Sequence, residues 1–374
     1  MAVNLIRNSR VFFTTNVDAI TGVVQATGCD TTDTFEIQVL DGFSFTQNTT
    51  NETITLNEAG ETPIRGQRSF NTALEPVDFS FSTYIRPRDG GTTVAAEELV
   101  LWDAFAAKDG ASALTLGTPT TVDFGDSNAH QLKKFGMIMI IDNDTYVIDN
   151  CVLDQASIDF GIDAIATIAW TGKGSAIRRV SAVSLSDAAG TTTLTGGIAG
   201  TAVTKITTAN YLANKLSAVT LKSGINNSGG TAYTVPITGG NITITNNVTY
   251  LTPANLGVVN KPITYFTGAR GVTGNLTAYL KTGTGATSDL LDALLTASAT
   301  TTEPKYNLTV HLGGSSSATL RVDLVMMGTV LQIPTINSEQ VISTTINFAA
   351  QGYTGSAYDV EATNELVVKY YNPV

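Results

Sequence analysis

The sequence has few of the residues on which catalytic and metal sites depend. Its 374 residues include two cysteines, Cys29 and Cys151, and two histidines, His130 and His311. Two cysteines cannot build a disulfide framework in a chain of this length. The histidines lie far apart, and neither has Cys or His partners at metal-ligand spacing. We therefore expect no disulfide scaffold and no metal centre.

Several other signals are absent. The amino terminus lacks the apolar run of a secretory signal, and the longest strongly apolar stretch, residues 135–141, is too short to span a membrane. No G-x-S-x-G, H-E-x-x-H, Walker or C-x-x-C motif is present. The acidic cluster between Asp142 and Asp163 lacks the spacing and the glycine of a calcium loop, so we interpret it as solvated strand ends or an exposed face and not as a cation site. These absences argue against an enzyme and against a bound cofactor.

Basic residues are also scarce. The chain has 21 Lys and Arg against 32 Asp and Glu, a net charge of −11, which argues against a protein that grips nucleic acid by neutralising phosphates. Charged residues make up 14% and hydrophobic residues 43%, and Gly and Thr are abundant. A Thr-rich chain with few Lys and Glu favours strands over helices. We predict a mainly β protein.

The two halves of the chain look like copies of one unit. Three segments recur in the same order with a drifting offset, as expected when a duplicated unit changes its loop lengths. The matched segments are 80–85 with 275–280, 101–105 with 290–294, and 166–170 with 344–348.

These matches divide the chain into a first unit, residues 1–185, a Gly/Thr-rich linker, residues 186–204, and a second unit, residues 205–374. The first unit has 12 basic and 23 acidic residues, a net charge of −11, whereas residues 186–374 have nine of each. Each unit reads as strands, one helix and further strands. The first helix is predicted at residues 96–107, with Trp102 and Phe105 in the core, and the second begins near Ser288 as N-cap.

Residues 48–76 form a long polar stretch, which we interpret as a loop. The stretch contains Glu58 and Glu61 together with Arg65 and Arg68, a mixture of both signs of charge that fits a docking segment. A solvated surface excursion explains the same composition equally well.

Several segments together resemble the major tail tube proteins of long-tailed, non-contractile bacteriophages, with the T-five-like group most similar. The resemblance extends from Leu5 to about Phe348. Its clearest segments are 5–12, 56–60 and 79–85 in the first unit, and 236–240, 246–253 and 274–280 in the second.

The resemblance implies two tandem β-sandwich units, each flanked by one α-helix, with one sheet of each unit contributing to a closed inner β-barrel. Three such chains would form a pseudo-hexameric ring, and stacked rings would form the tube. In this arrangement Glu58, Glu61, Arg65 and Arg68 become the expected contact between rings. Some relatives carry an additional immunoglobulin-like domain, which we do not expect here because the sequence ends at Val374.

The expected function is therefore a conduit for DNA ejection in the virion tail, assembled in the host cytoplasm. The resemblance implies as partners other copies of the chain, a tape-measure protein in the lumen, tail terminator and distal tail proteins at the ends, and DNA in transit without specific binding. No cofactor and no membrane insertion are expected. We further expect an electronegative lumen, because phosphates gain nothing at an acidic wall. A fibre or adhesin module and a contractile-tail tube remain open alternatives.

Overall fold

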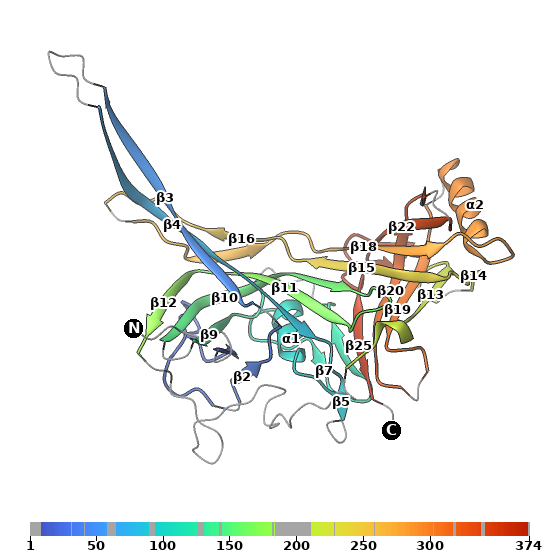
Figure 1. Ribbon diagram of the computed structural model, residues 1–374, viewed down its shortest axis with the longest axis horizontal. Helices are drawn as coiled ribbons and strands as arrows, with labels where there is room; N and C mark the ends of the chain where they lie inside the picture. Colours follow the sequence, from blue (N-terminus) through green and yellow to red (C-terminus); the bar gives the residue numbers. More distant parts are fainter. Residues whose placement is uncertain are drawn as a thin grey trace.

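The computed structural model shows a mainly β protein with two α-helices among the residues it describes, which confirms the predicted fold class (Figure 1). The description covers residues 9–372, apart from 31, 41, 58–64, 90–93, 126–130, 142–143, 182, 184–210, 228, 258, 302, 317–318 and 338–340. The predicted linker, residues 186–204, lies outside the described residues, as does His130.

The N-terminal half contains most of the long strands and helix α1. Its elements are β1 (Ser9–Thr14), β2 (Thr34–Ile37), β3 (Ser44–Asn57), β4 (Arg65–Tyr84), β5 (Arg88–Asp89), β6 (Val94–Ala95), α1 (Leu99–Ala106), β7 (Leu114–Thr115), β8 (Thr120–Asp123), β9 (Phe135–Ile141), β10 (Asp144–Asp159), β11 (Thr167–Gly174) and β12 (Ala176–Val180).

The C-terminal half begins with a short 3₁₀ turn, Asn214–Leu216. Its other elements are β13 (Ala218–Ser223), β14 (Ala232–Tyr233), β15 (Ile237–Thr245), β16 (Val248–Leu251), β17 (Thr264–Thr267), β18 (Gly271–Tyr279), α2 (Thr287–Ser298), β19 (Tyr306–Leu312), β20 (Arg321–Leu331), β21 (Thr335–Asn337), β22 (Ser343–Ala350), β23 (Tyr353–Thr354), β24 (Ala357–Tyr358) and β25 (Val367–Tyr371).

The same order of strand pairing occurs in both halves. In the N-terminal half, β1 pairs with β9, β9 with β10, β10 with β11, and β11 with β4, which pairs with β3. In the C-terminal half, β13 pairs with β19, β19 with β20, β20 with β22, and β22 with β18, which pairs with β15. Each helix follows the strand in the β4 or β18 position, so the helices also take corresponding places.

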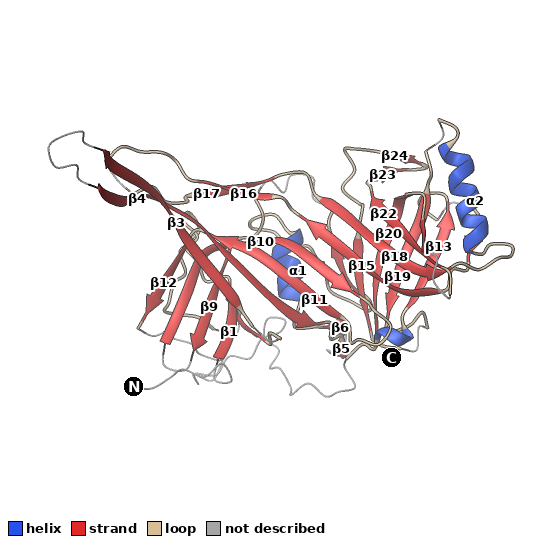
Figure 2. Ribbon diagram, turned by 45° about the horizontal axis from the view of Figure 1, so that its top comes forward, coloured by secondary structure: helices blue, strands red, loops and turns tan. Residues whose placement is uncertain are grey.

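Two antiparallel contacts join the halves into one continuous structure. The end of β10 pairs with β15, from Gln155 opposite Thr245 to Asp159 opposite Asn241, and β25 pairs with β8. The first contact creates one long sheet in the order β3–β4–β11–β10–β15–β18–β22–β21 (Figure 2). We call it the long sheet.

Both predicted helices are present, with one error at an end. Helix α1 occupies Leu99–Ala106, and all its side chains are buried because sheets enclose it. Helix α2 begins at Thr287, so Ser288 lies inside the first turn and is not the N-cap. Asp289 stabilises this end instead, because its carboxylate accepts the amide hydrogen of Gly285 at 2.8 Å.

Strand β9 has the predicted bounds, and its side chains from Phe135 to Met139 are buried. The irregular spacing of the isoleucines between Ile158 and Ile168 predicts a bulge or bend there. The structure has a turn and a bend at residues 162–164, between β10 and β11. A separate irregularity in the pairing of these two strands lies earlier, between Leu153 and Gln155.

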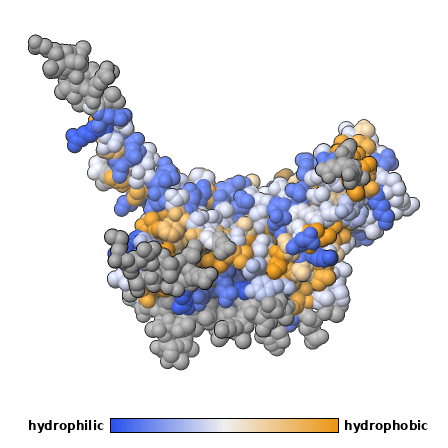
Figure 3. All heavy atoms as spheres, in the orientation of Figure 1, coloured by the Kyte–Doolittle hydropathy of each residue, from blue (hydrophilic) through white to orange (hydrophobic). Residues whose placement is uncertain are grey.

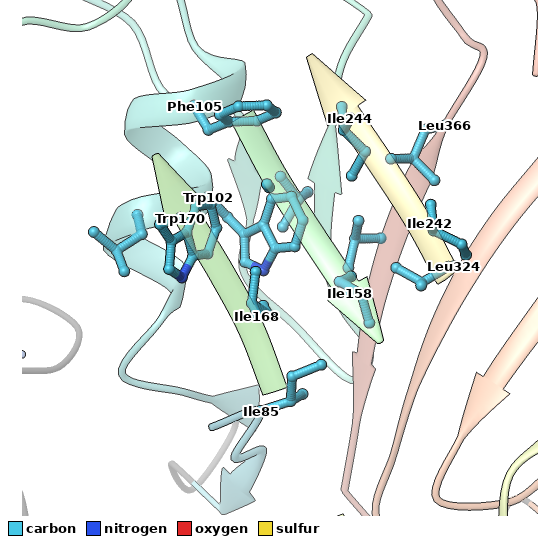
Figure 4. Close-up of a cluster of buried hydrophobic side chains, with 14 of the residues drawn as sticks. Ile85, Trp102, Phe105, Ile158, Ile168, Trp170, Ile242, Ile244, Leu324 and Leu366 are labelled. Atoms are coloured by element: carbon cyan, nitrogen blue, oxygen red, sulfur yellow. The ribbon is translucent and has the colours of Figure 1, made fainter. Parts of the chain in front are cut away.

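The core is continuous across both halves and is centred on two tryptophans (Figure 4). Trp102 of α1 and Trp170 of β11 are fully buried, with ring centroids 5.0 Å apart in an edge-to-face arrangement. This buried position confirms Trp102 as a core residue. Figure 4 shows the aromatic side chains beside the aliphatic residues of the adjoining strands, including Ile158 of β10, Ile242 of β15 and Leu324 of β20.

Hydrogen bonds fix the two indoles within this apolar surrounding. Trp102 Nε1 donates to the Tyr370 hydroxyl at 2.9 Å, and Trp170 Nε1 donates to Thr83 Oγ1 at 3.0 Å. Because Tyr370 belongs to the C-terminal strand β25, the first of these bonds connects segments 268 residues apart. The packing of α1 therefore depends on both halves.

A buried charged cluster lies at the amino end of α1. Arg86 forms an ion pair with Glu97, and Arg86 Nη1 donates to Gln38 Oε1 at 3.1 Å. The Arg86 amide donates to Glu98 Oε1 at 3.0 Å. Burial raises the pKa of Glu97 to about 7 and also raises the pKa of Glu98, because both carboxylates lose hydration.

We expect Tyr370→Phe to lower the free energy of unfolding by about 1–3 kcal/mol, because it leaves the buried Trp102 N–H without its acceptor. Tyr371→Phe is the matched control at the next, partly exposed position and should change stability by less than about 0.5 kcal/mol. Denaturant unfolding of both variants checks this expectation. Equal effects of the two substitutions would show that the buried hydrogen bond contributes nothing specific.

The Glu97 carboxyl makes stability depend on pH. Its pKa in the folded protein is about 7, above its ordinary value near 4.5, so its contribution is complete below about pH 4.5 and is lost as pH rises through 7. We expect the free energy of unfolding to fall by about 1–3 kcal/mol between pH 5 and 8 from this group. Glu97→Gln should have a flatter profile in parallel measurements, whatever its absolute stability; identical slopes would contradict the assignment.

Candidate assembly surfaces

One face of the long sheet is lined by hydroxyl and amide side chains. Along its strands, buried residues such as Ile242 and Leu276 alternate with partly exposed polar ones on the opposite face. We call this opposite side the polar face. Its polar uncharged residues include Ser44, Thr46, Ser80, Ser82, Gln155, Ser157, Thr167, Thr171, Asn241, Thr243, Thr245, Thr273, Asn275, Thr277, Thr335, Asn337, Ser343, Thr345 and Asn347.

Charge is sparse on the polar face. In the described strand segments of the body, leaving aside the part of β3 and β4 beyond Gln47 and Val77, the charged residues are Asp78, Asp154, Asp159 and Lys173, which sum to −2. Side-chain hydrogen bonds cross the pairing of β10 with β15, where Asn241 Nδ2 donates to Ser157 Oγ at 3.0 Å. Thr243 Oγ1 in turn donates to Asn241 Oδ1 at 2.9 Å. The face is therefore polar, nearly neutral and partly satisfied by its own hydrogen bonds.

The stretch predicted as a polar loop is a β-hairpin. Outward from Gln47 and Val77, β3 and β4 continue as a pair of strands that project away from the body, and we call this projection the long arm (Figure 1). The loop interpretation is thus wrong for residues 48–57 and 65–76, which are strands. The error has a physical cause, because the described part of the arm buries no apolar face and its sequence is mostly polar.

Of the four residues expected to contact another ring, Arg65 and Arg68 belong to the described outer part of the long arm. Arg65 begins β4 opposite Asn57, and the exposed Arg68 lies opposite Ile54. Glu58 and Glu61 lie outside the described residues. Two large apolar side chains on the arm, Ile54 and Phe70, are 47% and 48% exposed, and Figure 3 shows apolar residues between hydrophilic ones along its surface.

A second hairpin, formed by β16 and β17, lies across the N-terminal half, and sequence reasoning missed it. We call it the short arm. The hydroxyls of Tyr250 and Tyr265 donate to the backbone carbonyls of Asn150 and Leu132. At its tip, the Asn260 amide donates to the Thr72 carbonyl at 3.1 Å, beside the base of the long arm. The sequence feature that could have revealed this hairpin is the pair of short segments around Tyr250 and Tyr265, in each of which buried and exposed residues alternate.

The remaining titratable candidates form local ion pairs. Asp149 is buried and accepts from Arg178 Nε at 2.7 Å, so the interpretation of the acidic cluster as solvated strand ends is wrong at this position. His311 Nδ1 lies 2.8 Å from Asp323 Oδ1. Among the described residues, no group of three or more His, Cys, Asp or Glu side chains could hold a metal ion.

In the described part of the chain, no helix combines the length and apolar character needed to cross a membrane.

Comparison with known proteins identifies the relationship. No protein-family model matches the sequence. The chain is similar to the tail tube protein pb6 of Escherichia phage T5, with 31% identity over 388 residues. The alignment covers 98% of this chain and 79% of pb6. This similarity agrees with the resemblance read from the sequence segments and with the mainly β fold. The chain belongs to the family of tail tube proteins of T5-like, long-tailed phages.

Proposed function

We propose that this protein polymerises into stacked rings that form the phage tail tube, and that the tube is the conduit for DNA ejection. The observation that carries the proposal is the similarity to pb6 over nearly the whole chain. The long sheet supports it, because the sheet packs one face on the core and presents the other as a broad polar surface. No comparable observation favours a fibre or adhesin.

The proposed subunit consists of two tandem units, residues 1–185 and 205–374, joined by the linker at 186–204. The repeated order of strand pairing supports this division, as do the corresponding places of α1 and α2. Three copies would then supply six units to a pseudo-hexameric ring. Their long sheets would together form a closed inner β-barrel, in which no strand edge is left without a partner.

The polar face is the proposed wall of the bore. On this assignment the wall is nearly neutral, so it differs from the strongly electronegative lumen expected from the net charge. Hydroxyl and amide groups offer DNA no fixed cations, and phosphates passing them would release no counterions. Weak adhesion would therefore follow from the absence of basic groups more than from repulsion by acidic ones.

The long arm is the proposed contact between rings. Arg65 and Arg68 belong to its described strands, and Glu58 and Glu61 are the other two residues proposed to take part. Its projection from the body and its exposed Ile54 and Phe70 support this role, since both apolar side chains would be buried against a neighbour. Stacking of this kind joins two different surfaces and can continue indefinitely along an axis.

The further partners follow from the tube. A tape-measure protein would occupy the lumen during assembly in the host cytoplasm, terminator and distal tail proteins would close the ends, and DNA would pass without specific binding. The finished protein would belong to the virion tail.

Negative-stain microscopy of the purified protein tests the tube and the arm contact together. We expect the parent protein to form tubes of uniform diameter. Arg68→Glu should shorten them several-fold, because reversing one exposed charge weakens each copy of the contact by roughly 1 kcal/mol. Lys281→Glu is the matched control, an exposed cation reversed in the turn before α2, and should leave tube length unchanged.

The two parts of the proposal fail in different ways. Discrete globules or spikes from the parent under all conditions would contradict the tube. Tubes of parental length from Arg68→Glu would contradict the arm contact alone.

Basic substitutions test the bore wall. We expect Thr273→Lys combined with Asn347→Lys, both at exposed positions of the polar face, to make assembled tubes retain short double-stranded DNA at low salt. The retention should fall steeply as salt rises, since it depends on counterion release. Thr296→Lys on the exposed side of α2 is the control and should bind less DNA inside the tube. Equal, salt-insensitive retention by both proteins would contradict the assignment of the polar face to the bore.

A further inference from the structure

We infer that the contact between neighbouring copies in a ring repeats the contact that joins the two halves within one chain. The edge of β3 in one copy would pair antiparallel with the edge formed by the end of β20 and β21 in the next. This inference rests on the proposed ring and specifies which strands close it.

The template is the pairing of β10 with β15 inside the chain. The end of β10 has two neighbours, β11 on one side and β15 on the other. Backbone pairing runs from Gln155 opposite Thr245 to Asp159 opposite Asn241, and the Asn241–Ser157 hydrogen bond adds a side-chain contact. The junction therefore joins the two halves edge to edge through one unbroken sheet.

The repeat identifies the corresponding edges elsewhere in the molecule. Strand β3 corresponds to β15, because β3 pairs with β4 as β15 pairs with β18. Residues 330–337 correspond to the end of β10. Leu331 lies opposite Phe348 and Thr335 opposite Thr345, as Ala156 and Asp159 of β10 lie opposite Trp170 and Thr167 of β11. The segment from Leu331 to Thr335 differs in containing one extra residue.

Both edges have the properties of strands that await a partner. Within the described residues, β3 pairs only with β4, and β21 pairs only with β22. Natural sheets protect an exposed edge with charged residues, whereas residues 44–48 and 330–337 contain none. Pro334 removes one donor between β20 and β21, so pairing would proceed on either side of it.

Exposed apolar side chains accompany the β21 edge. Four large aliphatic residues in or beside the β21–β22 hairpin are between 46% and 61% exposed, an unusual amount for a sheet end that faces water. They are Ile333, Ile336, Val341 and Ile342. Covering them with the adjacent subunit would add apolar burial to the backbone hydrogen bonds.

The repeat fixes the register to one of two choices. With residues 80–85 matched to 275–280, Phe81 corresponds to Leu276. However, Phe81 pairs with Trp170, whereas the counterpart of Trp170, Phe348, pairs with Gly274. The register of β18 with β22 is therefore shifted by two residues relative to the register of β4 with β11. Ser44 would lie opposite Thr335 or opposite Ile333, and both choices keep its side chain on the same face, since the period of a strand is two.

Disulfide crosslinking in assembled tubes tests the inference. One protein carries Ser44→Cys with Thr335→Cys, and another carries Ser44→Cys with Ile333→Cys. We expect oxidation of one of these pairs to link neighbouring chains into covalent dimers and closed trimers on a non-reducing gel. The buried Cys29 and Cys151 remain in every variant.

The matched control is Ser44→Cys with Ile336→Cys. Residue 336 is adjacent to Thr335 but points to the opposite face, so its Cβ is directed away from that of residue 44 and crosslinking should be at least about tenfold lower. Each single variant is a second control and should give no crosslinked ladder.

The outcomes separate this inference from the proposed function. Tubes in which neither test pair links, or in which the control pair links equally well, would overturn the paired edges and leave the tube intact. Failure of the parent to form tubes would overturn the proposed function itself.

Hydrogen exchange of the parent protein provides a measurement without any substitution. Amides in residues 44–48 and 330–337 should exchange more slowly in tubes than in unassembled protein. Unchanged exchange of both segments in intact tubes would overturn the inference even if the cysteine variants did not assemble.

Discussion

The structure depends on the hydrogen bonds between β10 and β15. Strand β10 ends in the middle of the long sheet, and without β15 its final residues would present unpaired backbone groups to solvent. Their pairing joins two halves that each repeat one order of strands. It also makes one side of the whole sheet available as a continuous surface. A chain built in this way still ends in two unprotected edges, and pairing with another copy is the simplest way to satisfy them.

The hydrophobic core also holds the two halves together. Helix α1 is short, and every one of its side chains is buried, so it contributes packing rather than a solvent-facing surface. Trp102 connects the helix to Tyr370 of β25, and Trp170 connects β11 to Thr83 of β4. Because the apolar residues of β15 and β20 pack beside these rings, the halves share one core (Figure 4). The largest cluster of buried apolar residues therefore draws on both halves.

The sequence allowed prediction of features that depend on local pattern. The apolar run of β9, both helices and the internal repeat were all visible, because side-chain periodicity records burial directly. The long arm was misread, since a two-stranded projection in solvent leaves no apolar alternation. The error at Ser288 concerns a single position that is decided by neighbouring segments. The burial of Asp149 against Arg178 and of Glu97 against Arg86 depends on distant residues, which local pattern does not report.

Most of the net charge of −11 lies away from the polar face. The polar face contributes only −2 of it from its described strands in the body, so the remaining negative charge belongs to other parts of the molecule. Thr, Ser and Asn suit both tasks that the proposed bore combines. β-branched Thr favours the extended strands from which the wall is built, while its hydroxyl holds water without a fixed charge. DNA can pass through the proposed bore only if no site on the wall binds phosphate strongly. A neutral, hydrated wall meets that requirement. It also avoids the repulsion that rows of carboxylates on neighbouring strands would cause.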